Sequence, residues 1–250
     1  MINHKQHLYG LHTVHSFLKH KPQNALTLFV AKDRHDEKIK QILDLAHALK
    51  LPIEQTTIAK LNQLTQDGVH QGAVLLAKVV EYQESDLEPL LTELKEQPLL
   101  LVLDSIQDPH NLGACLRSAE SAGVDLVIIP KDRSATLTPL VRKIATGAAE
   151  IIPVVQVTNL RRALQIAQKQ GIWFIGLTVS PKAESLYKIK LTGPLGLVLG
   201  SEGTGLRMLT EQQCDGHAYI PMQGDIESLN VSVAAGIALF EALRQRLLAK

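Results

Sequence analysis

Three short segments of the chain combine glycine with polar side chains that do chemistry, namely residues 104–117, 197–206 and 220–232. The first contains Asp-Pro-His-Asn-Leu-Gly, which includes Asn111, and continues to Arg117. A guanidinium is charged at any workable pH, so Arg117 supplies a fixed cation that binds phosphate or stabilises a developing negative charge. Asn111 is well suited to cap the helix that follows. Taken alone, an ordinary capped helix with a surface arginine explains this segment at least as well.

The second segment reads Leu-Gly-Ser-Glu-Gly-Thr-Gly and begins at Leu199. Its glycines, Gly200, Gly203 and Gly205, allow backbone N–H and C=O groups to approach a ligand closely. The spacing is not Gly-x-Gly-x-x-Gly and no lysine follows the last glycine, so neither a dinucleotide fingerprint nor a P-loop is indicated. Glu202 would repel a phosphate, which favours a cofactor without phosphate groups. The alternative is a generic glycine-rich turn.

The third segment reads Ile-Pro-Met-Gln-Gly-Asp-Ile-Glu-Ser-Leu-Asn-Val-Ser, from Ile220 to Ser232. It indicates the apolar end of a strand, a loop with proline and glycine, and the start of a long helix. Ser228 and Asn230 place hydrogen-bonding side chains in an otherwise apolar stretch. Both residue types also cap helices routinely, so this segment alone does not establish a site.

The elements around these segments alternate between strands and helices. Continuous apolar runs of strand length predict buried strands at residues 99–103, 126–129, 151–155, 173–177 and 195–199. Apolar residues at helical spacing predict helices at about 112–122, 138–146, 160–170, 206–213 and 228–248. This alternation predicts an α/β fold with a parallel sheet covered on both faces. Ligands of such sheets bind beyond the carboxyl ends of the strands, and the three segments lie there.

The first eighty residues form a separate α/β pattern, which predicts a domain over residues 1–80. Strands are expected at 26–30 and 73–80, and helices at about 11–19, 38–49 and 58–64. This part holds 10 Lys and Arg against 6 Asp and Glu, a net charge of +4. Such a charge is compatible with contacts to RNA phosphates, and equally with an ordinary solvated surface.

An acidic segment separates this domain from the rest of the chain. Residues 81–96 hold 1 Lys against 6 Asp and Glu, a net charge of −5, whereas residues 97–250 hold 15 Lys and Arg against 13 Asp and Glu, a net charge of +2. We therefore expect residues 81–96 to be a linker, with a short helix over 87–94, and residues 97–250 to be a second domain.

Composition narrows the class of protein further. No apolar run approaches the about 20 residues of a membrane span, and the first residues lack the apolar stretch of a signal peptide. Cys115 and Cys214 lie far apart in the sequence and do not form a CxxC pair, so neither a disulfide framework nor a zinc site is indicated. Five of the 10 histidines fall within the first twenty residues, but without cysteine or carboxylate partners at ligand spacing. We expect a soluble, cytoplasmic protein with no metal.

Together the three segments closely resemble motifs 1, 2 and 3 of the SpoU (TrmH-type, SPOUT superfamily) RNA 2′-O-ribose methyltransferases. The shared patterns are Asp-Pro-x-Asn-x-Gly-x-x-x-Arg, Leu-Gly-x-Glu-Gly-x-Gly and Ile-Pro-Met-x-Gly-x-x-Glu-Ser-Leu-Asn-Val-Ser, which occur in the family's order. The resemblance implies a C-terminal SPOUT domain with a trefoil knot, S-adenosylmethionine as methyl donor, and a homodimer formed through that domain. General topology rules alone would exclude a knot.

The N-terminal part resembles the substrate-binding domain of one branch of that family. The stretches that carry this resemblance are Leu-Tyr-Gly-Leu-His-Thr-Val, from Leu8, and Val-His-Gln-Gly-Ala-Val, from Val69. This resemblance implies an RNA-binding domain similar in fold to the ribosomal proteins L30e and L7Ae. It also implies ribosomal RNA as the partner, with a guanosine of the 23S peptidyl-transferase loop as the target.

The family's motifs imply roles for individual residues. Arg117 lies beside the target 2′-hydroxyl, either as its base or as a charged group that binds the adjacent phosphate and stabilises the alkoxide. The side chains expected to hold Arg117 and the nucleotide are Asn111, Glu202, Ser228 and Asn230. The residues expected to enclose S-adenosylmethionine are Leu199, Gly200, Ile220, Met222 and Leu229, with Thr178 as a weaker candidate.

Three alternatives remain at this point. The same chemistry could act on another RNA, such as tRNA. The chain could also be a non-catalytic RNA-binding protein on a decayed methyltransferase fold, although the intact Asn111, Arg117, Glu202 and Asn230 argue against decay. A nicotinamide dehydrogenase is disfavoured because no Gly-x-Gly-x-x-Gly follows the first strand of the second domain.

Overall fold

A computed structural model describes residues 1–32, 34, 36–201, 203–225 and 228–249. Contacts between Cα atoms divide the chain into two compact units, which we treat separately. The first unit comprises Ile2–Glu81 together with Leu137–Ile151, and the second comprises Met1, Tyr82–Thr136 and Ile152–Lys250. Within the described ranges, no helix is both long and apolar enough to cross a membrane.

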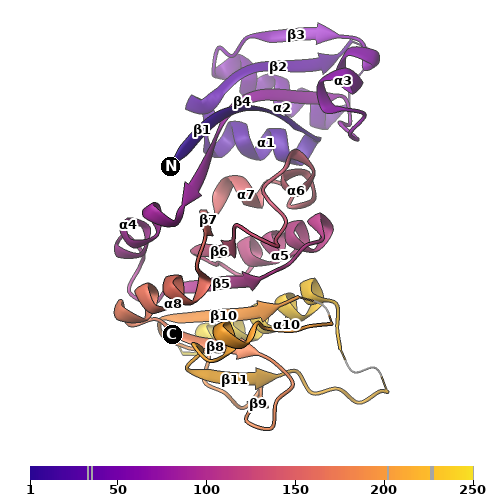
Figure 1. Ribbon diagram of the computed structural model, residues 1–250. Coiled ribbons are helices and arrows are strands. Elements are labelled where there is room, and N and C mark those ends of the chain that lie inside the picture. The colour runs from indigo at the N-terminus through magenta and orange to yellow at the C-terminus, as the bar shows by residue number, and fades with distance from the viewer. Residues whose placement is uncertain (33, 35, 202, 226–227, 250) are drawn as a thin grey trace. The chain divides into compact units, whose positions relative to one another are not determined.

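Four strands form the sheet of the first unit (Figure 1). Strand β4 (Ala73–Gln83) pairs antiparallel with β1 (Ile2–Tyr9) on one side and with β2 (Ala25–Ala31) on the other. Strand β3 (Ile53–Thr56) extends the sheet by pairing parallel with β2. The predicted strands at 26–30 and 73–80 are confirmed, whereas β1 and β3 were not predicted.

Helices cover both faces of this sheet. Helices α1 (Leu11–His20) and α2 (Glu37–Ala48) pack against one face, where Leu8, Phe17 and Ile42 are buried in a common core. Helix α3 (Ile58–Thr65) covers the other face, over a smaller cluster. The three predicted helices of the N-terminal part are thus confirmed, and their buried positions recur at the spacing of one helical face. A 3₁₀ turn, η1 (Pro22–Asn24), joins α1 to β2.

Two short helices from later in the sequence complete the first unit. Helices α6 (Pro139–Ile144) and α7 (Ala148–Ile151) pack against α1. Between them, Nη1 of Arg142 lies 2.5 Å from Oε1 of Glu150, and both side chains are only 1% exposed. Nζ of Lys21 lies 4.0 Å from the other oxygen of Glu150. The sequence pattern predicts that this segment belongs with the rest of residues 97–250, because a buried ion pair leaves no signature in hydrophobic periodicity.

The second unit is a parallel sheet, as predicted. Its strand order is β4, β7, β6, β5, β10, β8, β11 and β9, where β4 contributes only its last residues, Tyr82 and Gln83. Every pair in this order is parallel. The remaining strands are β5 (Leu99–Asp104), β6 (Leu126–Pro130), β7 (Val154–Val157), β8 (Trp173–Leu177), β9 (Glu184–Ser185), β10 (Leu195–Gly200) and β11 (Gly216–Tyr219).

Helices lie on both faces of this sheet as well (Figure 1). Helices α4 (Leu87–Thr92) and α8 (Leu160–Lys169) contribute to one apolar core, while α5 (Pro109–Ser121) and α10 (Val231–Leu248) pack against each other and α10 contacts β10. The short α9 (Met208–Glu211) follows β10.

Two element boundaries differ from prediction. The strand expected at 151–155 begins only at Val154, because helix α7 occupies the preceding residues and Pro153 intervenes. The helix expected at 206–213 is confined to α9. The acidic segment 81–96 is largely regular: β4 ends at Gln83, a 3₁₀ turn η2 covers Glu84–Asp86, and α4 follows.

Candidate active site

The register of the central strands brings three loops to one edge of the second sheet. Leu199 of β10 is aligned with Leu103 of β5 and with Leu177 of β8. Parallel strands in register end together, so the chain leaves β5, β8 and β10 at neighbouring points. Two of the three sequence motifs therefore begin side by side, and the third reaches the same edge from β11.

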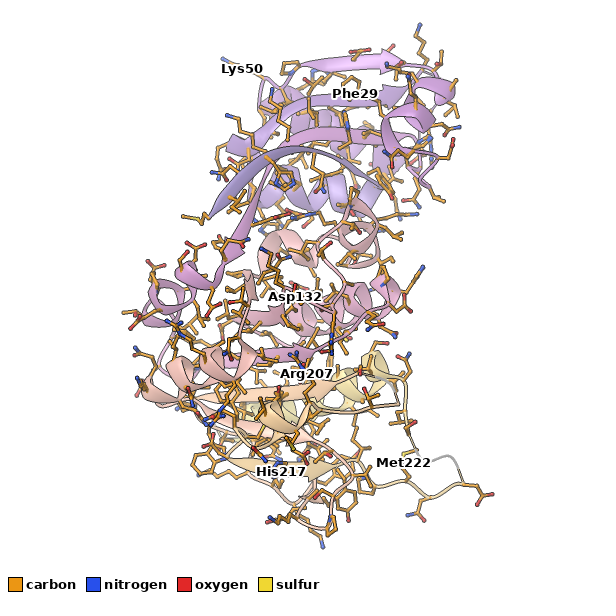
Figure 2. The ribbon with its side chains drawn as sticks, in the orientation of Figure 1. Phe29, Lys50, Asp132, Arg207, His217 and Met222 are labelled. Atoms are coloured by element: carbon orange, nitrogen blue, oxygen red, sulfur yellow. The ribbon has the colours of Figure 1, made fainter. Side chains whose placement is uncertain are left out.

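A salt bridge fastens two of these loops. Asp104, the last residue of β5, is fully buried, and its Oδ1 lies 2.6 Å from Nε of Arg207. Its other oxygen accepts the backbone N–H of Arg207 at 3.1 Å. Arg207, which is labelled in Figure 2, follows β10 in the chain. A buried carboxylate that accepts several hydrogen bonds is held in one position, so the chain after β10 is fixed to the end of β5.

A pocket of about 500 Å³ opens at this edge of the sheet. All six residues that the sequence predicted to enclose a cofactor line it, and Ser228 lines it too. Figure 2 shows Met222 on the loop that leads from β11 to α10. The lining residues are Leu177, Thr178, Val179, Leu199, Gly200, Ser201, Gly203, Thr204, Gly205, Ala218, Tyr219, Ile220, Met222, Ser228, Leu229, Val231 and Ala234.

The glycine-rich loop after β10 folds back tightly on itself. The N–H of Gly205 donates to the carbonyl of Ser201 at 2.9 Å, and the hydroxyls of Ser201 and Thr204 are 2.6 Å apart. Gly203 and Gly205 have φ angles of +81° and +66°, which glycine adopts without strain. A Cβ at Gly200 would lie 2.0 Å from the carbonyl carbon of Gly205, so only glycine fits there.

We predict that Gly200→Ala weakens S-adenosylmethionine binding by about 100-fold, because the added methyl group forces the loop out of the pocket wall, a cost we set at about 3 kcal/mol. Isothermal titration calorimetry of the variant measures this directly. Gly236→Ala, within α10, is the matched control, since a Cβ there meets only Oγ of Ser118, at an ordinary contact distance of 3.8 Å. Equal affinities for the Gly200 variant and the wild type would show that the loop does not line the cofactor pocket.

A second pocket of about 320 Å³ adjoins the first and shares Ser201, Thr204 and Val231 with it. Its other lining residues follow β5 and begin α5, and they include Asn111. Four of them, all except Asn111, were not among the predicted site residues, although they lie within the first motif segment. The left-handed conformation of Ser105 (φ +64°) is uncommon for a residue other than glycine and marks this loop as a candidate functional segment. The further lining residues are Ser105, Ile106, Gln107, Asp108 and Asn111.

Two predicted site residues are joined by a hydrogen bond. Nδ2 of Asn230 donates to Oδ1 of Asn111 at 2.9 Å, across 119 residues of sequence. Asn230 also caps α10, because its Oδ1 accepts the N–H of Ser232 at 2.9 Å. The prediction that Asn111 caps the helix that follows it is wrong. Asp108 caps α5 instead and accepts the N–H of His110 at 2.8 Å, because α5 starts at Pro109, three residues earlier than expected.

Arg117 is exposed on α5. Like Asn230, it is not among the described lining residues of the two pockets. Among the residues that the structure describes, no hydrogen bond or ion pair to its guanidinium is recorded, which leaves the charge available for a ligand. Glu202, the remaining predicted side chain, lies outside the described residues.

Cys214, which follows α9, is chemically quiet. The Cys214 thiol donates to the carbonyl of Thr210 at 3.4 Å. Burial, and after it the carboxylates of Asp215, Glu211 and Asp104, raises the pKa of this thiol to about 12. The thiolate is the reactive form, so Cys214 is a packing residue and not a nucleophile.

Two family models match the chain. The SpoU rRNA Methylase family matches residues 98–240, which include all three motifs. A second model, described as RNA 2′-O ribose methyltransferase substrate binding, matches residues 7–83.

Similar proteins cover nearly the whole chain. The protein called 23S rRNA (guanosine-2′-O-)-methyltransferase RlmB from Vibrio parahaemolyticus is 47% identical over 97% of this chain and 98% of its own length. The protein of the same name from Pectobacterium atrosepticum is 49% identical over 96% of this chain and 98% of its own.

A solved structure shares the fold at lower identity. The SpoU methyltransferase AviRb from Streptomyces viridochromogenes, in complex with AdoMet, superposes with a TM-score of 0.80 at 21% identity, over 98% of this chain and 91% of the other. Since one family model spans more than half of the sequence and full-length relatives are almost half identical, the chain belongs to the SpoU rRNA methylase family.

Proposed function

We propose that this protein transfers a methyl group from S-adenosylmethionine to the ribose 2′-hydroxyl of a guanosine in the peptidyl-transferase loop of 23S ribosomal RNA. The observation that carries this proposal is the near full-length similarity to several proteins named as 23S rRNA guanosine-2′-O-methyltransferases. Similarity extends through both parts of the chain, so it includes the part that selects the RNA as well as the part that performs the chemistry.

The larger pocket fits the cofactor that this chemistry needs. Its volume of about 500 Å³ lies in the range of small-molecule sites, about 300–1,000 Å³. Apolar side chains such as Leu177 and Leu229 suit the faces of an adenine ring, and the tightly folded glycine loop offers backbone groups to its edge. These contacts do not require a phosphate group on the ligand, which agrees with a cofactor without phosphates.

S-adenosylmethionine, when bound, supplies a methyl group on a positively charged sulfur. In the transfer, the 2′-oxygen forms a bond to the methyl carbon, the carbon–sulfur bond breaks, and the hydroxyl proton leaves to water. We assign Arg117 the electrostatic role: its guanidinium binds the neighbouring phosphate and stabilises the developing alkoxide. The exposed and unpaired position of this side chain in the described structure supports that assignment.

The paired asparagines have a positioning role in this proposal. The bond between Asn230 and Asn111 ties the start of α10 to the first turn of α5, between the two pockets. We propose that they, with Ser228 and Glu202, orient the target ribose toward the methyl group, since alignment of the reacting atoms is a large part of such catalysis.

We also propose a division of labour between the parts of the chain. Residues 1–80 would form the substrate-binding domain, residues 81–96 the connection, and residues 97–250 the methyltransferase domain with its trefoil knot. A ribosomal RNA substrate implies that the protein works in the bacterial cytoplasm.

A homodimer through the second unit is part of the proposal. Helix α10 exposes Val233 and Phe240, at 49% and 48%, with Ile237 between them on the same side of the helix. An apolar stripe of this kind favours a helix from a second copy. We predict that Phe240→Glu shifts the protein from dimer to monomer in light scattering coupled to size exclusion. Gln170→Glu, at an exposed position of the same unit, is the charge-matched control, and a monomeric wild type would contradict the proposal.

The function itself is tested in two steps. Calorimetry with S-adenosylmethionine asks whether the cofactor binds, and the absence of binding would favour a non-catalytic RNA-binding protein. Ribose methylation is then mapped across the 23S rRNA of a deletion strain, with and without the complementing gene. We expect one guanosine in the peptidyl-transferase loop to lose its methyl group and to regain it. An unchanged 23S pattern, with a tRNA position lost instead, would refute the assigned substrate and leave the chemistry standing.

A further inference from the structure

Basic side chains gather at the start of α1 in the first unit. Nζ of Lys38, on α2, lies 3.4 Å from Nε2 of His12, on α1, and both side chains are exposed. Nζ of Lys143, on α6, lies 6.0 Å from the centre of the Tyr9 ring, where β1 ends and α1 begins. Arg34 precedes α2. We call Arg34, Lys38, Lys143 and His12 the α1 basic cluster.

Gln71 connects the parts of this cluster. Its side-chain oxygen accepts the first N–H of α1, from Leu11, at 3.2 Å, and its backbone carbonyl accepts Nη1 of Arg34. A Cβ at Gly10 would lie 3.3 Å from Cγ of Lys143 and 3.4 Å from Oε1 of Gln71. Arg34 and Lys143 therefore flank the same turn, although 109 residues separate them in sequence.

The electrostatics agree with this geometry. Burial lowers the pKa of His70, next to Gln71, and the positive charges of Arg34 and Lys143 lower it further. Both cations thus act on one imidazole. Asp36 is already engaged, because its oxygens accept Nε of Arg34 at 2.6 Å and the N–H of Ile39 in the α2 cap.

Two of these cations are unpaired. Lys38 and Lys143 have no carboxylate within ion-pair distance among the residues described. The start of α1 adds the positive end of a helix dipole to their charges. The Tyr9 ring is only 6% exposed, so it offers no platform for stacked bases. A ligand with closely spaced negative charges on an extended backbone fits this surface best.

We propose that the α1 basic cluster binds backbone phosphates of the structured RNA substrate, with Lys143 as a contact supplied from outside the N-terminal segment. The proposal rests on the proposed function, because it identifies where that RNA is held. Lys143 lies beyond the residues 7–83 that the substrate-binding family model matches, yet it packs within the same compact unit. The RNA site would accordingly combine residues from both parts of the sequence.

The test compares two double variants of the full-length protein, each of which removes two positive charges. Lys38→Gln/Lys143→Gln removes the two unpaired cations of the cluster. Lys40→Gln/Lys19→Gln is the control: both of its lysines are exposed, and Lys40 lies about 200° around α2 from Lys38. Binding is measured by fluorescence anisotropy at a series of KCl concentrations. The RNAs are a transcript of the 23S peptidyl-transferase loop and an unrelated structured RNA of equal length.

We expect the cluster variant to bind the 23S transcript at least about 10-fold more weakly, with a salt slope smaller by about 1.4–1.8, since each lost phosphate contact removes about 0.7–0.9. The control variant should stay within about twofold of wild type. Far-UV circular dichroism of each variant checks its fold.

Equal affinities and slopes for the two double variants would overturn the proposal. Failure of the proposed function looks different: the wild type would then fail to methylate the 23S transcript. The slopes on the unrelated RNA would still decide whether the cluster binds phosphates. If the cluster variant misfolds, the affinity and salt slope of the single variant Lys38→Gln, at an exposed position, are compared with those of Lys40→Gln. The expected change in slope is then half as large.

Discussion

Arg117→Ala is expected to lower the single-turnover rate of methyl transfer by about 10³-fold, the size of effect seen when one preorganised donor to a developing oxyanion is removed. The side chain is exposed on α5 and lies outside the described pocket linings, so its loss should leave S-adenosylmethionine affinity unchanged. The measurement is a rapid-quench time course with enzyme in excess over labelled RNA, together with calorimetry for the cofactor.

Two further measurements separate the roles open to this residue. Arg117→Lys keeps a positive charge but loses the planar fork of donors, and under the electrostatic role it should recover part of the lost rate. The pH dependence of Arg117→Lys separates the two roles. The electrostatic role predicts a rate that falls as the pH rises through the lysine pKa, about 10.4, whereas a general base would give a rate that rises there. Near wild-type turnover of Arg117→Ala would rule out both roles.

Glu150→Ala is expected to destabilise the first unit by about 3–5 kcal/mol, because it leaves the guanidinium of Arg142 buried without a counter-charge. The cost is high since Nε and Nη2 of Arg142 already lack a hydrogen-bond partner among the described residues. Lys21 would lose its acidic neighbour too, and burial already lowers the pKa of that amine. Urea denaturation followed by circular dichroism measures the loss.

The matched control replaces both charges by an apolar residue. Arg142→Leu/Glu150→Leu should recover most of the stability, as buried ion pairs are often replaced by apolar side chains without loss. Trp173, the single tryptophan, lies in the second unit, so its fluorescence reports that unit separately. A double variant as unstable as Glu150→Ala would show that helix packing, and not the uncompensated charge, sets the cost.

The strands and helices that could be predicted are those whose pattern of apolar residues follows from their burial. All six residues of β5 are buried. A continuous apolar run of this length in the sequence indicates a buried strand of a parallel sheet. Strand β1 was missed because its first four residues, Ile2 to Lys5, are exposed. Its position depends on backbone pairing with β4, which leaves no hydrophobic alternation to detect. Strand β3 was not predicted for the same reason.

The residues that line the larger pocket could be predicted from the motifs, because parallel strands in register bring the residues at their carboxyl ends close together. Leu199 and Thr178 could be placed together once their strands were known to be parallel. The pairing of Asn111 with Asn230 could not be predicted, since no rule of spacing joins side chains from two helices so distant in sequence. The same holds for Lys143, whose place in the first unit depends on how α6 packs against α1 and not on its neighbours in the chain.

The two native thiols have a practical consequence for spectroscopy. Cys115 is fully buried, and Cys214 carries a proton far above neutral pH. Maleimide dyes attack thiolates, so at pH 7 both residues should react slowly with them. A cysteine introduced at an exposed position outside the α1 basic cluster, such as Lys40 on α2, would then be the preferred site of labelling without removal of the native pair. Fluorophores attached there could follow the arrival of RNA in real time.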